Sequence, residues 1–337
     1  MKLETSQHHQ LRNEEQRRIR TLYRFALAAT VATYLLIFAG GLVRVSGAGM
    51  GCPDWPKCYG MWIPPTDASQ LKPPYDPAAF NATLTWIEYI NRLMGVLVGL
   101  MIVATLGYAV WRFWRVPRFV VPALVATGLV AVQGWLGKIV VKTDLNPFVV
   151  TLHLSLALVI VCTLIYLTVQ TYSAMQKEQS ESQRTETLSA AGLWLFAMLQ
   201  LMLGTQVREK LEWLSRNFPL FTEAEWLEQV GWIGKVHGAT GLLLTLLTWW
   251  VGYKLLSENK TFTSLAQRCL LTMMALSLAE VVVGLSLVWI GIPAVMQVFH
   301  QWIASLYVGA AFTLTTWFYL TEGKAIELSV QRKEAVA

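Results

Sequence analysis

Long apolar stretches separated by short polar segments run along almost the whole chain. A helix needs about 20 apolar residues to cross a hydrocarbon core about 30 Å thick. Eight stretches reach that length and together take about half of the 337 residues, which leaves no room for a separate soluble domain. We expect transmembrane helices at Phe25–Val43, Ile87–Val110, Phe119–Val140, Phe148–Thr171, Leu188–Val207, Ile233–Val251, Leu270–Ile290 and Val295–Leu320.

The composition also indicates an all-α membrane protein. Hydrophobic residues make up 55% of the chain and charged residues only 14%, against about 25% charged residues in soluble domains. The chain also has 15 tryptophans and 11 tyrosines, residue types that gather at the membrane interface. The net charge of +6 is explained by basic cytoplasmic loops, so nucleic-acid binding is not expected.

Basic residues are concentrated in alternate polar segments. Seventeen of the 27 fall on one side of the predicted membrane, and the positive-inside rule makes that side cytoplasmic. Both termini are then cytoplasmic (N-in, C-in), with cytoplasmic segments at 1–24, 173–187 and 321–337. The N-terminal segment contains acids and no apolar core, so we expect neither a signal peptide nor a transit sequence. The basic residues counted are Lys2, Arg12, Arg17, Arg18, Arg20, Arg24, Arg112, Arg115, Arg118, Lys177, Arg184, Lys254, Lys260, Arg268, Lys324, Arg332 and Lys333.

Two long outer loops are predicted, at 44–86 and 208–232. The first holds seven of the twelve prolines, and its cysteines Cys52 and Cys58 can close a disulfide in an oxidising exterior. Either a structural staple or a labile redox bond is compatible with this spacing. The second loop mixes apolar and acidic residues and is expected to lie along the membrane surface. The other two cysteines, Cys162 and Cys269, fall in or beside spans and are expected to be apolar fillers.

An internal repeat divides the chain into two halves. The run Gly40–Arg44 corresponds to Gly204–Arg208, and Trp86–Gly95 corresponds to Trp232–Gly241. In each half, 20 residues separate an amide or acid in the third span from a histidine in the fourth. The repeat therefore predicts two tandem four-helix bundles, at 25–172 and 188–320.

Matched polar residues in the two halves are the candidates for chemistry, because ionisable residues inside spans are costly and usually functional. We expect His153, His237 and His300 at one depth near the outer face. A pair of facing imidazoles suits heme iron, and the two arginines suit heme propionates. Packing histidines and interfacial anchoring are the structural alternatives, and too few ligands cluster for a zinc site. The matched residues are Arg44, Asn91, Gln133 and His153, and then Arg208, His237, Glu280 and His300.

Glu88 is a separate candidate. It lies three residues before Asn91, on the same helical face, and its counterpart in the second half is Gly234. A carboxylate present in one half only argues against a requirement of the fold. The alternative is an acid placed favourably at a helix start.

These motifs resemble the heme A synthase family, whose members oxidise heme O to heme A for cytochrome oxidase. The resemblance covers all eight spans. It is carried by the run from Gly41 to Cys58, by Glu88-Tyr-Ile-x-Arg92, by Gly204–Arg208, and by histidines 153, 237 and 300.

The resemblance implies different tasks for the two halves. The second half would hold heme b between His237 and His300. The first would receive heme O, with Glu88 catalytic in the oxidation of the C8 methyl group to a formyl group. Substrate-heme binding would involve His153, Asn91, Arg92 and Arg44, and propionate or supporting contacts would involve Arg208, Gln133 and Glu280.

Asn91 departs from the family pattern Glu-x-x-His-Arg, because an asparagine amide is a poor iron ligand. Three interpretations follow. The substrate iron is five-coordinate on His153, Asn91 holds a water or an oxygen intermediate above the metal, or the first half is impaired. We favour the first two together, because oxygen chemistry needs an open position on iron.

The resemblance further implies a bacterial plasma membrane location, lipid contact, an electron donor and coupling to a heme O synthase, with homo-oligomerisation left open. Two other classes remain. A b-type heme electron-transfer protein would share the histidine pair without modifying heme. A transporter would use the duplicated halves as a translocation path, although both halves are predicted to have the same orientation.

Overall fold

Helices account for most of the structure. The computed structural model describes residues 2–176, 184–257 and 264–334, and within them the one β contact is a bridge between Cys58 and Met61. Short 3-10 turns occur at Ala48–Met50, Ala68–Gln70 and Pro77–Ala79. The α-helices are α1 (Lys2–Val45), α2 (Ala82–Phe113), α3 (Pro117–Lys142), α4 (Pro147–Met175), α5 (Arg184–Asn217), α6 (Glu223–Val230), α7 (Trp232–Ser257), α8 (Ser264–Ile290) and α9 (Ala294–Glu334).

All eight predicted spans are confirmed as helices long and apolar enough to cross a membrane. Polar caps set where several of them begin. Asn81 Oδ1 accepts the N–H of Leu84 at the start of α2, and Asn146 caps α4 in the same way. Proline occupies the first turn of α3 and of α4. The first N–H groups of a helix have no partner inside it, so caps and prolines favour a helix start at these positions.

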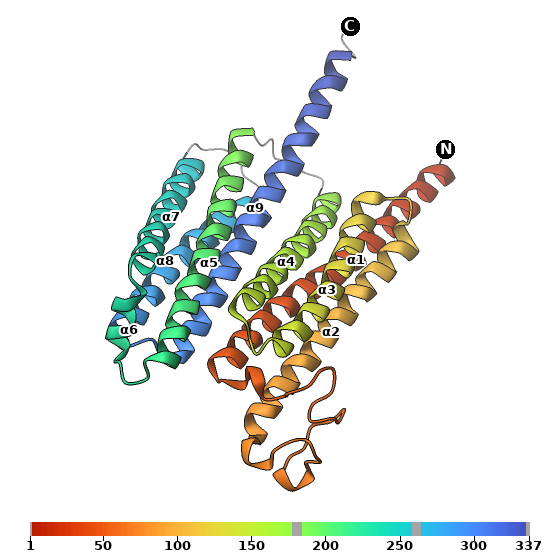
Figure 1. The fold of residues 1–337 in the computed structure, drawn as a ribbon. Coiled ribbons are helices and arrows are strands. Elements are labelled where there is room, and N and C mark those ends of the chain that lie inside the picture. Colours follow the sequence, from red (N-terminus) through yellow and green to blue (C-terminus); the bar gives the residue numbers. More distant parts are fainter. Residues whose placement is uncertain (1, 177–183, 258–263, 335–337) are drawn as a thin grey trace.

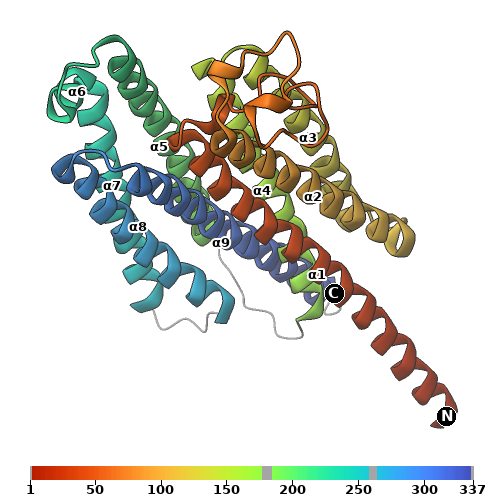
Figure 2. The same cartoon turned by 90° about the horizontal axis from the view of Figure 1, so that it is seen from below.

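The spans pack as two groups of four (Figure 1). The first bundle consists of α1, α2, α3 and α4, and the second of α5, α7, α8 and α9. Helix α9 packs against both α1 and α4, and therefore joins the bundles along their length (Figure 2). The start of α1 and the end of α9 lie at one end of the molecule, and segment 46–81 and α6 lie at the other, here called the loop end (Figure 1).

Hydrogen bonds of two aromatic side chains connect the two bundles. The Tyr34 hydroxyl of α1 donates to the carbonyl of Ser305 in α9 at 3.3 Å, and Trp302 Nε1 donates to the Tyr34 carbonyl at 3.1 Å. The Tyr34 hydroxyl lies where a side chain at Gly309 would begin. Because Gly309 has no Cβ, α1 and α9 can approach closely.

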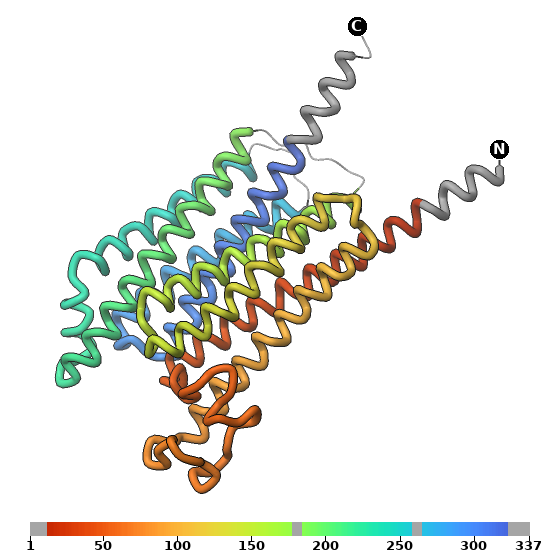
Figure 3. The backbone as a smooth tube through the Cα atoms, turned by 45° about the vertical axis from the view of Figure 1, so that its right-hand side comes forward, coloured from red at the N-terminus to blue at the C-terminus, as the bar shows by residue number. Residues whose placement is uncertain are grey.

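Helix ends differ from the predicted ones. Helix α5 continues to Asn217 instead of ending at Val207, and α6 follows, so most of the expected surface loop 208–232 is helical. Helix α6 forms because Thr222 and Glu225 make a reciprocal capping box. Residues 2–24 of the first expected terminal segment belong to α1, and residues 321–334 of the second belong to α9. The coloured part of α1 extends beyond the neighbouring helices of its bundle (Figure 3). Lys177 and Lys260 lie outside the described residues, as does the part 177–183 of the linker 173–187.

Gly309→Leu tests the joint between the bundles. The new side chain would meet Tyr34 and Ile165, and overpacking of this kind costs about 1–3 kcal/mol. We expect the melting temperature of the detergent-purified protein to fall by about 2–8 °C. Gly107→Leu is the control, because nothing lies within 4 Å of its Cβ position. Equal melting temperatures for the two variants would contradict the packing role of Gly309.

Candidate functional site

Two intramembrane imidazoles face each other in the second bundle. His237 in α7 and His300 in α9 have ring centroids 6.1 Å apart and ring planes at 86°. Two imidazole nitrogens bound at about 2 Å on opposite sides of one metal ion place their ring centroids roughly 6 Å apart. The rings are thus spaced as a pair of axial ligands would be.

Polar groups contact the Nδ1 atom of each imidazole. Gln200 of α5 places Nε2 at 3.1 Å from His237 Nδ1 and donates to the His237 carbonyl at 2.8 Å. Its Oε1 accepts from the Thr240 hydroxyl at 2.6 Å, which fixes the amide. Glu280 Oε2 lies 2.7 Å from His300 Nδ1, a close contact that is not aligned as a hydrogen bond. In each ring Nδ1 therefore lies beside a polar group, and Nε2 is the other nitrogen.

Glycines make room for the imidazoles. A Cβ at Gly204 would lie 3.0 Å from His237 Cε1, and a Cβ at Gly284 would lie 3.4 Å from His300 Cε1. Within the described part of the chain, no group of three or more His, Cys, Asp or Glu residues could hold a metal ion. The donor set therefore suits a metal whose other ligands come with it, as in a porphyrin.

The first bundle has one imidazole at the corresponding place. His153 in α4 lies against Gly137, whose Cβ would be 3.5 Å from its Cε1, and its carbonyl accepts from Gln133 at 3.1 Å. Three buried polar atoms have no hydrogen-bond partner among the described residues: Asn91 Oδ1, Gln133 Oε1 and His153 Nδ1. A Cβ at Gly40, the counterpart of Gly204, would meet nothing within 4 Å. This bundle therefore offers polar groups and space to a bound molecule.

Glu88 is buried beneath the cysteine loop. The predicted disulfide between Cys52 and Cys58 is confirmed, and residues 52–58 are here called the disulfide loop. The Cys52 N–H donates to Glu88 Oε2 at 2.9 Å. Arg92, one helical turn from Glu88, donates to its Oε1 from Nε at 3.0 Å and also from Nη2. The carboxylate is thus held between α2 and the disulfide loop.

The disulfide loop approaches α2 closely. The Thr85 hydroxyl donates to the Gly51 carbonyl at 2.8 Å, and a Cβ on Gly51 would lie 2.6 Å from the Leu84 carbonyl carbon. Only glycine permits this contact. On the far side of the loop, burial and the nearby Asp54 carboxylate raise the pKa of the Tyr75 hydroxyl.

The two predicted propionate arginines lie at the junction of the bundles. Arg44 pairs with Glu212 at 2.9 Å, and Arg216 pairs with the other oxygen of Glu212 at 2.7 Å. Arg208 interacts electrostatically with Glu212 but makes no hydrogen bond or ion pair among the described residues. Arg208 is therefore the arginine with free donors.

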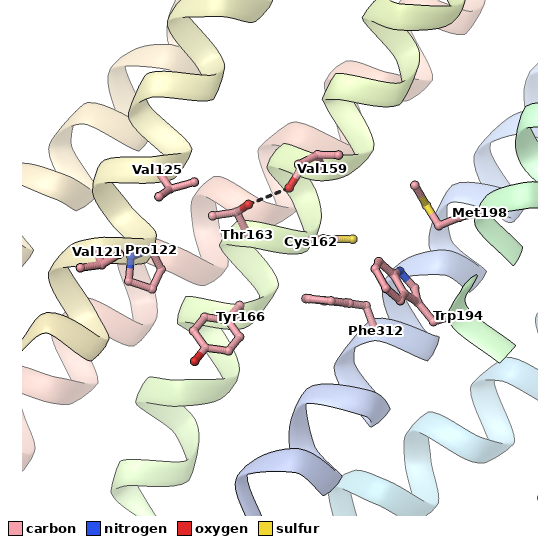
Figure 4. A pocket seen from close by; sticks show the side chains of 10 residues that line it. All are labelled: Val121, Pro122, Val125, Val159, Cys162, Thr163, Tyr166, Trp194, Met198 and Phe312. Carbon is pink, nitrogen blue, oxygen red and sulfur yellow. Dashed lines mark hydrogen bonds between the residues drawn. The ribbon is translucent and has the colours of Figure 1, made fainter. Parts of the chain in front are cut away.

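An apolar groove runs between the bundles farther from the loop end (Figure 4). Its volume is about 400 Å³. Pro122, Cys162, Trp194 and Phe312 line it from α3, α4, α5 and α9. Cys162 and Cys269 are buried free cysteines, as expected of fillers. The lining carries no charge, so the groove can accept an aliphatic chain.

Two residues of this site were not predicted. Gln200 lies in the middle of an apolar span, a signal of the same kind as Gln133 and Glu280 that could have identified it. Glu212 was assigned to a loop, and only the extension of α5 brings it to Arg44.

Eight helices long and apolar enough to cross a membrane, which enclose ionisable side chains, define a multi-pass membrane protein. Residues 23–312 match the family model COX15-CtaA, cytochrome oxidase assembly protein. The chain belongs to this family.

Curated relatives carry a more specific name. The chain is 24% identical over 290 residues to the heme A synthase of Exiguobacterium sp., a match that covers 85% of this chain and 89% of the relative. It is 24% identical over 355 residues to that of Brucella ovis, with 91% and 93% covered. With that of Shewanella oneidensis it shares 29% identity over 216 residues, which cover 59% and 61%.

Gly51→Ala tests the seating of the disulfide loop on α2. The new methyl group would strike the backbone of Leu84, which cannot move aside cheaply. We expect the loop to lift and the Cys52–Cys58 bond to be reduced about tenfold faster by a phosphine. Alkylation of the released thiols measures this rate. Gly95→Ala in α2, which meets nothing within 4 Å, is the control; identical rates in both variants would contradict the contact.

Proposed function

We propose that this chain is a heme A synthase, a membrane oxidoreductase that converts heme O to heme A for the assembly of cytochrome oxidase. Membership of the cytochrome oxidase assembly family and the names of the relatives support this activity. The observation that carries it is the spacing of the imidazoles of His237 and His300, together with a single imidazole at the matching place in the first bundle.

We also propose that the two bundles are a tandem repeat with both termini in the cytoplasm of a bacterial cell. In each bundle a histidine of the fourth span packs on a glycine sixteen residues earlier, Gly137 for His153 and Gly284 for His300. The start of α1 and the end of α9 lie together, opposite the disulfide loop (Figure 1). A disulfide is stable in an oxidising exterior, which supports an outer position for the loop end.

The second bundle would hold heme b as a permanent cofactor, with His237 and His300 as axial ligands. When bound, this heme supplies one-electron redox chemistry. The protein side chains set ring orientation: Gln200 contacts Nδ1 of one ligand and Glu280 approaches Nδ1 of the other. Such contacts fix the tautomer and make a ligand more basic.

The first bundle would bind heme O as an exchangeable substrate. His153 Nδ1 has no hydrogen-bond or ion-pair partner among the described residues, whereas His237 Nδ1 lies 3.1 Å from Gln200 Nε2 and His300 Nδ1 lies 2.7 Å from Glu280 Oε2. Leu36 stands where the repeat has Gln200, and Asn91 stands where it has His237. We propose that His153 is the single axial ligand and that Asn91 faces an open side of the substrate iron.

Glu88 would act on the reacting C8 group. Conversion of the methyl group to an alcohol inserts one oxygen atom, and conversion of the alcohol to the formyl group removes two electrons and two protons; a carboxylate held beside that carbon would accept such a proton. Arg92 holds Oε1 and the Cys52 N–H holds Oε2, so the carboxylate of Glu88 is fixed in one orientation. The substrate propionates would bind Arg208. Arg44 would contact the propionates while it keeps its ion pair with Glu212.

Contacts with an electron donor and a heme O synthase, and homo-oligomerisation, stay predictions. The alternative function is a b-type heme electron carrier. It would use the same histidine pair but would leave the bound heme chemically unchanged.

Extraction of hemes from cells that express the protein with a heme O source separates the two functions. We expect heme A by mass, together with a reduced b-type absorbance band in the purified protein. Glu88→Ala should abolish heme A, a decrease of at least about 100-fold, and keep the b-type band. Glu228→Ala, an exposed acid in α6, is the control. Unchanged heme A in Glu88→Ala would remove Glu88 from the mechanism.

Asn91→His tests the open side of the substrate iron. A second imidazole should give a six-coordinate substrate heme and suppress carbon monoxide binding to the reduced protein by about tenfold or more. Asn91→Leu, which adds no ligand, should retain carbon monoxide binding. If the unmodified protein loaded with heme O bound no carbon monoxide, the open position would be excluded.

A further inference from the structure

Every N–H donor of Arg92 is engaged within the protein. A guanidinium has five N–H donors and no acceptor. Beside the two hydrogen bonds to Glu88, Nη1 donates to the carbonyls of Asp54 at 2.7 Å and Lys57 at 3.0 Å, and Nη2 donates to that of Cys52 at 3.1 Å. These five hydrogen bonds leave Arg92 no donor for another molecule.

Three of the four acceptor atoms belong to the disulfide loop, and the fourth is Glu88 Oε1. The carbonyl oxygens of residues 52, 54 and 57 all accept hydrogen bonds from the Arg92 guanidinium, so the closed loop binds this group through three points of its backbone. The Arg92 side chain is 14% exposed, and that of Glu88 is 6% exposed. A cation so far removed from water is stabilised only if all its donors are satisfied, and here the loop satisfies them.

We propose that Arg92 is a positioning residue: it clamps the disulfide loop onto α2, fixes Glu88 for the reaction, and does not bind the carboxylates of the substrate. This replaces the earlier expectation that Arg92 binds substrate heme. The heme readouts, which are heme O binding, heme A yield and the b-type band, rest on the proposed function; the mechanical role stands on the hydrogen bonds alone.

A lysine cannot take over this role. Its ammonium group carries three donors on a flexible stem and cannot reach the four acceptor atoms that the planar guanidinium joins through five hydrogen bonds. Arg92→Lys therefore keeps the positive charge but loses the clamp. This variant distinguishes the effect of the charge from the effect of the hydrogen-bond geometry.

The test uses full-length protein in a Cys162→Ser/Cys269→Ser background, so that only Cys52 and Cys58 can be labelled. Arg92→Gln, Arg92→Lys and the control Arg208→Gln are compared with this background. The measurements are the rate of disulfide reduction by a phosphine, the heme O dissociation constant by absorbance titration, the heme A yield, and the b-type band.

In Arg92→Gln we expect disulfide reduction about tenfold faster and heme A yield lower by about 10- to 100-fold, because a misplaced catalytic group costs that much. The heme O dissociation constant should change by less than about threefold and the b-type band should persist. Arg92→Lys should resemble Arg92→Gln. Arg208→Gln should show the opposite pattern: an unchanged reduction rate and weaker heme O binding.

An unchanged reduction rate in both Arg92 variants would overturn the clamp. Heme O binding at least about tenfold weaker with a normal reduction rate would instead make Arg92 a substrate ligand. If Arg92→Gln misfolds and loses the b-type band, the rate of disulfide reduction in Arg92→Lys tests the clamp instead. Should the unsubstituted protein make no heme A, the proposed function fails, whereas the reduction rates in the Cys162→Ser/Cys269→Ser background still decide the clamp.

Discussion

The approach of two imidazoles across the second bundle is the constraint on which the rest of the structure depends. His237 and His300 come from α7 and α9, and their rings meet at a centroid distance of 6.1 Å. Gly204 makes room for this approach, because a Cβ there would lie 3.0 Å from the His237 ring, and Gly284 of α8 lies against the His300 ring. Helix α5 also supplies Gln200 to His237. Polar groups inside a membrane are costly unless paired, and these contacts involve all four helices of the bundle.

The first bundle has the same framework but lacks these pairings. His153 lies on Gly137 as His300 lies on Gly284, yet its Nδ1 has no partner, and Asn91 adds a second unsatisfied group. A cofactor that stays bound gains from ligands held rigidly, whereas a substrate that enters and leaves needs a site with unsatisfied groups. The rigidity of the first bundle lies instead at its loop end, around Glu88. In the proposed function, the difference between a cofactor site and a substrate site would depend on which of these polar side chains have partners.

Much of this could be predicted from the sequence, because membrane spans and intramembrane polar residues follow local rules. The eight spans follow from apolar length, and the convergence of His237 and His300 follows from the repeat spacing. The roles of Arg92 and Glu212 could not be predicted, because their partners lie on segments far away in the sequence. Three of the five N–H donors of Arg92 form hydrogen bonds with carbonyl groups of the disulfide loop. Glu212 reaches Arg44 only because α5 runs past its apolar stretch, supported by the capped helix α6.

Electron paramagnetic resonance of the oxidised, heme-loaded protein tests the central claim most directly. Imidazole planes at 86° should give a low-spin ferric signal of the strongly anisotropic type, because perpendicular axial rings leave the iron d orbitals nearly degenerate. The signal should vanish in His237→Ala and in His300→Ala and persist in His153→Ala. A low-spin signal that survives both second-bundle substitutions, or one that disappears with His153, would contradict the account.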